Sequence, residues 1–284
     1  MTTTTDSASY KKSAISLFIA LGLFLLIYFP VLSGLVTEWY NDDNYSHGFL
    51  IPFISGYLIW KKRARLKELI NPAGDNTGLP IFLAGMALFV LSTAAAEYFT
   101  LRLSLIITLY GLVWYLLGRR VAIAAWFELL FLVFMIPLPY VIYYAATFPM
   151  QLFATKVTVK ILNMIGMTAV RQGNIIHLPG YSLEVAEACS GLRSLISLLA
   201  LGAVYARTTQ KGLPRQIILF LSTIPIAVGA NIFRILFTSV GAYTISRELA
   251  EDFLHELSGM MVFIVAFIML FIWGGVIKMG SKKI

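Results

Sequence analysis

The sequence predicts an all-α fold, a polytopic membrane helical bundle with about eight transmembrane helices. Of its 284 residues, 59% are hydrophobic and 13% are charged, and the mean hydropathy is +0.82. A water-soluble fold of this length cannot hide so much apolar surface. The apolar runs 190–206, 216–237 and 258–277 each approach the roughly 20 residues that cross a bilayer as a helix. We expect one integral-membrane domain over residues 1–284, with no separate soluble domain.

The remaining spans follow from shorter or interrupted apolar runs. Run 14–35 is too long for a signal-peptide core and lacks a small-residue cleavage site, so it is a retained first helix. Run 47–60 is short and relies on flanking aromatic residues to reach both interfaces. Three more spans are expected at 78–96, 100–117 and 121–136.

Two segments between the fifth and sixth spans have other patterns. Pro137 and Pro139 end the fifth span. Residues 149–170 are amphipathic, with Lys156 and Lys160 on one face, and the sequence leaves open whether this helix lies in the interface or enters the membrane. Residues 171–188 contain Gly and Pro among short alternating pieces, which predicts an irregular or strand-like loop.

The distribution of charge predicts the orientation in the bacterial inner membrane. The net charge is +8, and the basic residues form short clusters between apolar runs. The positive-inside rule places these clusters and both termini in the cytoplasm and the acidic loops outside, and one assignment satisfies every loop. We therefore attribute the excess charge to orientation in the membrane, and expect membrane lipid but no nucleic acid as a partner. The inner clusters begin at Lys11, Lys61, Arg119, Arg207 and Lys278, and the outer acidic residues are Asp42, Asp43, Glu248, Glu251 and Asp252.

Cys189, the single cysteine, is a candidate nucleophile. It lies where the outer loop enters the sixth span, in the string EVAEACSGLRSL. Unpaired N–H groups and the positive end of the dipole at a helix start favour a thiolate. The alternative is a small apolar residue packed between helices, which is the commoner role of a lone cysteine.

Arg234, near the outer end of the seventh span, is a candidate for stabilising negative charge. An arginine within a membrane span is costly, which indicates a function. Asn231 lies one turn earlier on the same face and is expected to orient it. The alternative is a side chain that snorkels to the interface. Arg193, one turn after Cys189, competes for the same role.

His255, just before the last span, is a candidate general acid and base, because the pKa of an imidazole suits proton exchange near neutrality. His47 in YSHGFLIP and His177 in the outer loop are alternatives, and an interfacial histidine without chemistry is another reading. The spacing does not choose among them.

Other chemistries lack their signatures in the sequence. There is no Gly-rich phosphate loop, HExxH pair, CxxC or GxSxG elbow. The outer acidic residues are too scattered for a metal site, and we expect no metal and no cofactor. Nucleophilic thiol chemistry is the hypothesis that remains.

Four strings together resemble the exosortases and their archaeal relatives, the archaeosortases. They are ACSGLRSL at 188–195, NIFR at 231–234, HELSG at 255–259 and YSHGFLIP at 45–52. Their order and topological placement agree with the family over nearly the whole chain. Some exosortases carry an additional C-terminal periplasmic domain, and we expect a short form without it.

The resemblance implies a membrane cysteine transpeptidase that cleaves C-terminal sorting signals of exported proteins, typically Pro-Glu-Pro (PEP-CTERM) motifs followed by a hydrophobic tail. The family's proposed residues correspond to Cys189 as nucleophile, Arg234 as oxyanion stabiliser and His255 as acid and base. Glu187 is a weaker candidate for orienting His255 or Arg234. The acceptor that resolves the thioester is unknown. The competing hypotheses are a small transporter and a structural subunit of an envelope polysaccharide export system.

Overall fold

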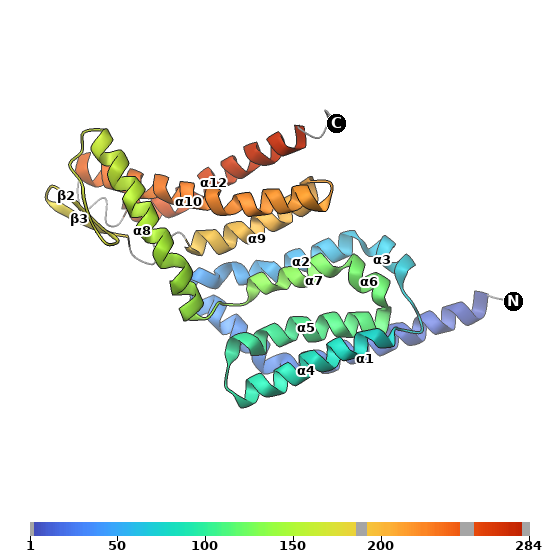
Figure 1. Cartoon of the computed structure of the whole chain (residues 1–284). Helices are drawn as coiled ribbons and strands as arrows, with labels where there is room; N and C mark the ends of the chain where they lie inside the picture. The colour runs from blue at the N-terminus through green and yellow to red at the C-terminus, as the bar shows by residue number, and fades with distance from the viewer. Residues whose placement is uncertain (1–2, 186–191, 245–252, 280–284) are drawn as a thin grey trace. The chain divides into compact units, whose positions relative to one another are not determined.

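The computed structural model describes residues 3–185, 192–244 and 253–279, and it is 83% helical (Figure 1). The predicted all-α class is therefore confirmed. The chain divides into two compact units, Met1–Leu138 and Pro139–Ile284.

The first unit is a group of helices joined by short turns. Its α-helices are α1 (Thr3–Asn41), α2 (Leu50–Lys61), α3 (Arg63–Leu69), α4 (Leu79–Ala94), α5 (Tyr98–Leu117), α6 (Arg119–Ala124) and α7 (Trp126–Phe131). Three 3₁₀ helices connect or extend them: η1 (Asp43–Phe49), η2 (Asn76–Gly78) and η3 (Leu132–Met135).

Helices α4 and α5 form the closest pair in this unit because glycine lets their backbones approach. A Cβ added to Gly111 would lie 2.3 Å from the backbone nitrogen of Phe82. The turn between them is closed by Glu97, whose carboxylate accepts from the backbone N–H groups of Phe99 and Thr100 at 3.1 and 2.7 Å. This confirms the tight turn predicted at that position, and the two helices keep nearly the predicted bounds.

The second unit is a helical group with a small sheet at one end. It comprises α8 (Tyr140–Met164), β1 (Val170–Gln172), β2 (Ile175–Leu178), β3 (Tyr181–Glu184), α9 (Leu192–Thr209), α10 (Leu213–Thr244) and α12 (Phe253–Met279). The strands form an antiparallel sheet in the order β1-β2-β3. The strand-like loop predicted at 171–188 is thus confirmed over the described residues.

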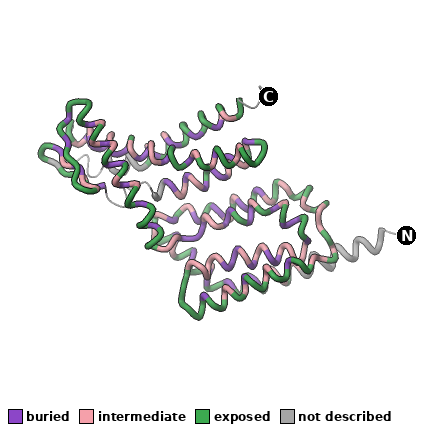
Figure 2. The backbone as a smooth tube through the Cα atoms, viewed as in Figure 1, coloured by how far each residue is buried: buried purple, intermediate pink, exposed green. Residues whose placement is uncertain are grey.

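Figure 1 shows α9, α10 and α12 side by side, with the sheet and α8 at the end where α9 begins. The core of the group is apolar and includes Leu198, Leu219, Val262 and Ala266, all buried. Figure 2 shows buried residues recurring between exposed ones along α10 and α12. Many exposed side chains are large and apolar, such as Ile272 at 64% exposure. An apolar outer surface is what a lipid environment requires.

The structure contains five helices long and apolar enough to cross a membrane, or six if the broken pair Trp126–Met135 and Tyr140–Met164 counts as one span, within the part of the chain that it describes. The chain is therefore a multi-pass membrane protein. The expected number of about eight is not confirmed by this criterion, because α2 and the apolar part of α9, Leu195–Thr209, are shorter than a full span.

Two predicted boundaries near the candidate site are wrong. Helix α10 continues to Thr244, so Arg234 lies ten residues inside it (234 to 244) rather than near its end. Helix α12 begins at Phe253, so His255 belongs to its first turn instead of preceding it. In both cases polar residues at a helix end were interpreted as loop, although helical hydrogen bonds continue through them.

Candidate active site

Arg234 lies within the second unit on the side of α10 that faces α9. Its exposed fraction is 6%, so protein covers it and the snorkelling interpretation is wrong. Thr223 marks the side of α10 that faces α9, because a Cβ on Gly202 of α9 would lie 2.3 Å from its Oγ1. Arg234 follows Thr223 by 11 residues (223 to 234), which is about three helical turns. The two residues therefore lie on the same side of α10.

The level of Arg234 along α10 matches the beginning of α9. Helices α9 and α10 form an antiparallel hairpin, so the beginning of α9 and the end of α10 lie at the same end of it. From their contact at Gly202 and Thr223, Leu192 is 10 residues back (202 to 192) and Arg234 is 11 residues forward. At 1.5 Å per residue, both lie about 15 to 17 Å from the contact.

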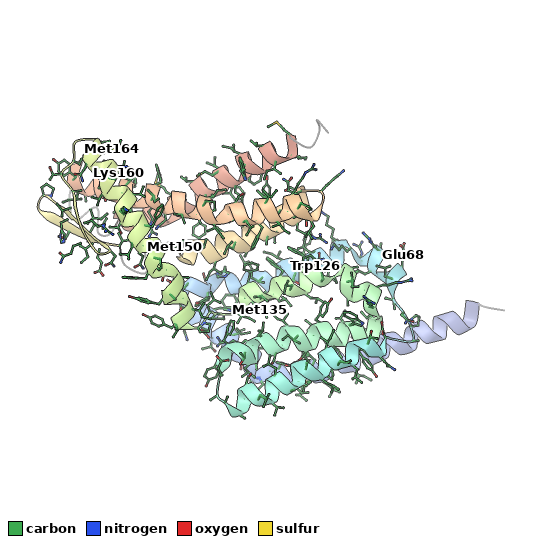
Figure 3. All side chains as sticks on the ribbon, in the orientation of Figure 1. Glu68, Trp126, Met135, Met150, Lys160 and Met164 are labelled. Atoms are coloured by element: carbon green, nitrogen blue, oxygen red, sulfur yellow. The ribbon has the colours of Figure 1, made fainter. Side chains whose placement is uncertain are left out.

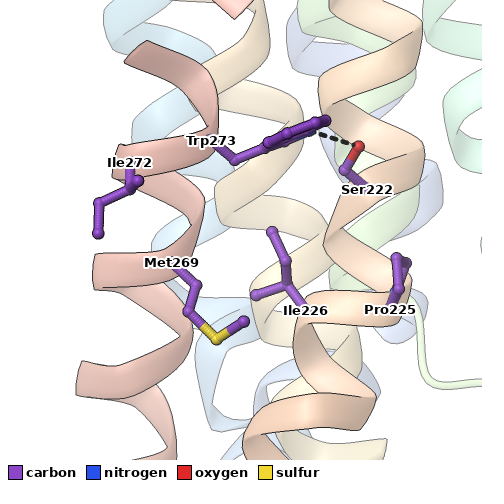
Figure 4. A pocket seen from close by; sticks show the side chains of 6 residues that line it. All are labelled: Ser222, Pro225, Ile226, Met269, Ile272 and Trp273. Carbon is purple, nitrogen blue, oxygen red and sulfur yellow. Dashed lines mark hydrogen bonds between the residues drawn. The ribbon is translucent and has the colours of Figure 1, made fainter. Parts of the chain in front are cut away.

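The level of His255 follows from the packing of α10 on α12. Trp273 Nε1 donates to Ser222 Oγ at 2.9 Å, which aligns these antiparallel helices (Figure 4). Arg234 lies 12 residues after Ser222 (222 to 234), and Met261 lies 12 residues before Trp273 (273 to 261). His255 is six residues earlier still, about 9 Å further along the axis. The backbone of His255 is thus within two turns of the level of Arg234.

Four predicted site residues are not placed by their side chains, and of His255 only the backbone is described. Cys189 and Glu187 lie outside the described residues. Arg193 is the second residue of α9, and only its backbone is described. In the sequence Cys189 precedes the start of α9 by three residues (189 to 192). The described helices therefore bring the levels of Arg234 and His255 to the point where the chain enters α9.

Asn231 is placed on the predicted face, one turn from Arg234, but it does not orient that side chain through its carbonyl. It is 3% exposed, and its Oδ1 has no hydrogen-bond partner in the described part of the chain. Arg234 does engage in a further interaction. That interaction does not involve Asn231 Oδ1.

A buried polar face on α8 was missed by the sequence analysis. Thr147, Gln151, Thr155 and Thr158 recur at helical spacing and are between 0 and 3% exposed. The described elements that pack on α8 are α10 and the strands β1 and β2. The predicted amphipathicity is real, but the face that carries these threonines was not predicted. The spacing of the threonines was a visible signal for the opposite face.

The face of α8 opposite the buried threonines is exposed and basic. Lys156 and Lys160 are both exposed, as the sequence predicted for one face of this segment. Figure 3 shows Met150, Lys160 and Met164 along α8, with the last two near the sheet. Helix α8 begins at Tyr140, nine residues before the predicted start at 149, and contains Pro149.

His47 lies in η1 of the first unit, whereas Cys189, Arg234 and His255 belong to the second. Its Nε2 donates to the carbonyl of Phe134 at 3.2 Å, and its Nδ1 is buried without a partner in the described residues. Burial lowers the pKa of His47 below its ordinary value, although the carbonyls of Phe134 and Asn44 oppose this. A neutral, packed imidazole at this position supports the first unit.

His177, the other alternative base, is held by its own sheet. Its Nδ1 lies 2.8 Å from Ser182 Oγ, and its Nε2 donates to Gln172 Oε1 at 3.2 Å. Both nitrogens are therefore engaged with neighbouring strands. Among the described residues, no three His, Asp or Glu side chains gather as a metal site.

An apolar groove of about 370 Å³ opens between α10 and α12 (Figure 4). Its lining is Ser222, Pro225, Ile226, Met269, Ile272 and Trp273. It lies around the Ser222–Trp273 hydrogen bond, about three turns along α10 from Arg234, so it is separate from the candidate active site.

Comparison with known protein families identifies a family for this chain. The family model described as transmembrane exosortase (Exosortase_EpsH) matches residues 39–272, which include Arg234 and His255 as well as Cys189. A search of curated proteins and a search of solved structures found no match.

Proposed function

Because the chain belongs to the transmembrane exosortase family, we propose that it is a membrane-embedded cysteine transpeptidase that cleaves C-terminal sorting signals of exported proteins. The substrates are of the PEP-CTERM type, with a hydrophobic tail that inserts into the bilayer. The active site lies on the periplasmic side of the inner membrane, and both termini are cytoplasmic. This topology has eight spans and counts the short helices α2 and α9 among them.

The observation that carries the proposal is the position of Arg234. It is a buried cation on the α9-facing side of α10, at the level where the chain enters α9 just after Cys189. A guanidinium in a site that excludes water stabilises a developing oxyanion far more than it does in water. The level of His255 supports a role for the imidazole in proton transfer at the same end of the helices.

The proposed reaction has two stages. His255 takes the proton of Cys189, and the thiolate attacks the scissile carbonyl carbon, whose oxygen becomes an anion stabilised by Arg234. The C–N bond then breaks, His255 returns the proton to the departing amine, and a thioester remains on Cys189. An acceptor, either water or an amine, attacks the thioester and loses a proton to His255, and Cys189 leaves as a thiolate that takes this proton back from His255.

The test is co-expression with a reporter that ends in a Pro-Glu-Pro motif, a hydrophobic helix and a basic cluster. We expect wild type to remove the tail, seen by mobility shift and intact mass. Cys189→Ala, Cys189→Ser and His255→Ala should leave the reporter intact. Arg234→Lys keeps the charge but loses the planar fork, so processing should fall about 100-fold or more. Membrane abundance of each variant is the control.

The mass of the product identifies the acceptor, because hydrolysis adds water and transpeptidation adds a larger group. If Cys189→Ala trims the reporter as wild type does, the thiol mechanism is wrong. A transporter or an export subunit, the competing hypotheses, would then be the next candidates to test.

A further inference from the structure

Helices α8 and α10 pack on each other, and together they carry three buried oxygens with no hydrogen-bond partner in the described residues: Thr158 Oγ1, Asn231 Oδ1 and Ser239 Oγ. Their residues are 0, 3 and 0% exposed. About nine in ten or more of the buried polar groups in proteins are satisfied, and each one left unpaired destabilises the fold. Three unpaired oxygens on two helices that pack together indicate that a hydrogen-bonding partner other than the described residues satisfies them.

The three oxygens lie around one packing contact. Ala154 and Leu162 of α8 belong to the same buried apolar cluster as Ile235 of α10. Thr158 is one turn from both Ala154 and Leu162, because it lies four residues from each. Ile235 likewise lies four residues after Asn231 and four before Ser239. The unpaired oxygens therefore surround the place where α8 meets α10.

This contact adjoins the candidate active site. Arg234 immediately precedes Ile235 and lies one turn from Asn231. Asn231 follows Thr223, which faces α9, by eight residues. At 100° per residue this spacing rotates Asn231 about 80° around the axis of α10, away from the side that faces α9. The rotation is toward the side of Ile235, which shares a buried cluster with residues of α8. The polar contact thus extends from Arg234 toward α8.

We propose that this contact, defined by Thr158, Asn231 and Ser239, binds the main chain of the substrate next to the scissile bond, with α8 moving off α10 to admit it. The inference rests on the proposed function. Asn231 Oδ1 can accept hydrogen bonds but cannot donate them, so it needs a donor on its partner. The N–H groups of an extended peptide are donors at regular spacing. Hydroxyl groups accept and donate, so they suit a main chain of any sequence.

The chain offers a matched pair of variants for the test. Thr155 lies on the same buried face of α8 as Thr158, but its hydroxyl already donates to the carbonyl of Gln151 at 2.6 Å. Thr158→Val and Thr155→Val make the same chemical change at equal burial. Only Thr158→Val removes an oxygen that has no hydrogen-bond partner in the described residues and can therefore bind substrate.

The measurement is steady-state tail removal by purified full-length enzyme in lipid nanodiscs, with a synthetic peptide carrying the motif and tail. We expect Thr158→Val and Asn231→Ala to raise KM about 5- to 10-fold with kcat nearly unchanged, which corresponds to roughly 1 kcal/mol of substrate binding. Thr155→Val and Thr158→Ser should retain the wild-type KM.

Two outcomes overturn the inference while leaving the proposed function intact. Either wild-type KM values persist in Thr158→Val and Asn231→Ala, as they would if water alone filled the contact, or kcat falls without a rise in KM. A wild-type enzyme that does not cleave any tailed peptide overturns the proposed function, and the inference with it.

Discussion

The position of Arg234 within a membrane helix is unfavourable in free energy. Insertion of an arginine near the centre of a membrane helix costs about 3 kcal/mol, and this side chain is buried inside the helical group rather than extended to the interface. Packing of α9 on α10 does not require it, because small and apolar residues such as Gly202 make that contact closely. A cation retained at this cost, at the level of a helix start, is best explained by chemistry at that point.

His47 shows the opposite relation, a titratable residue whose burial serves the fold. Its pKa is lowered by burial, so the unfolded chain binds the proton more tightly than the folded one. The stabilisation is therefore full above the ordinary pKa of about 6.5 and is lost as the pH falls below it. We expect the melting temperature in detergent to fall from pH 7 to pH 5, and less steeply in His47→Gln.

Asp75 and Glu97 do not interfere, because hydrogen bonds lower the pKa of both and their contributions are lost only below their ordinary values of 3.8 and 4.5. A slope that is unchanged in His47→Gln would contradict the assignment.

At the scale of the elements, a helix pair that packs closely at a glycine cannot accept a larger side chain there without moving. A Cβ at Gly111 of α5 would lie 2.3 Å from the nitrogen and 2.6 Å from the Cα of Phe82 in α4. These are backbone atoms, so the two helices would have to separate. We expect Gly111→Ala to destabilise the first unit by about 1 to 3 kcal/mol, measured as a lower melting temperature by tryptophan fluorescence.

Gly56→Ala in α2 is the matched control, because nothing lies within 4 Å of the added Cβ. It should be neutral or slightly stabilising, since alanine has the higher helix propensity. Equal melting temperatures for the two variants would show that α4 and α5 can adjust at no cost.

At the scale of the whole molecule, the short helices α2 and α9 decide the topology. If both cross the membrane, as the charge distribution predicts, Asp43 and Gln172 lie outside and Asn76 and Lys211 lie inside. All four are exposed. We expect single cysteines at the first two positions, in a Cys189→Ala background, to react with an impermeant thiol reagent in cells with an intact inner membrane.

Cysteines at Asn76 and Lys211 should react only after the inner membrane is lysed. Labelling of Asn76→Cys in intact cells would mean that α2 does not cross, and labelling of Lys211→Cys would mean the same for α9. Either result would reduce the number of spans toward the five or six recognised from helix length and composition.

The sequence by itself determined the class of this protein, because hydropathy and charge are sums over residues that need no neighbours in space. It also determined the turn at Glu97, the break at Pro137 and the strands after α8, which depend on local backbone chemistry. The short motifs around Cys189, Arg234 and His255 were sufficient to suggest the family.

Only the tertiary structure decided where helix ends lie and which face of a helix is covered. It placed Arg234 ten residues inside α10, separated His47 from the other candidates by unit, and buried the polar face of α8 that includes Thr158. The physical reason is that burial and register arise from contacts between segments distant in the chain. A threonine stripe has the same sequence pattern whether it faces water, lipid or another helix.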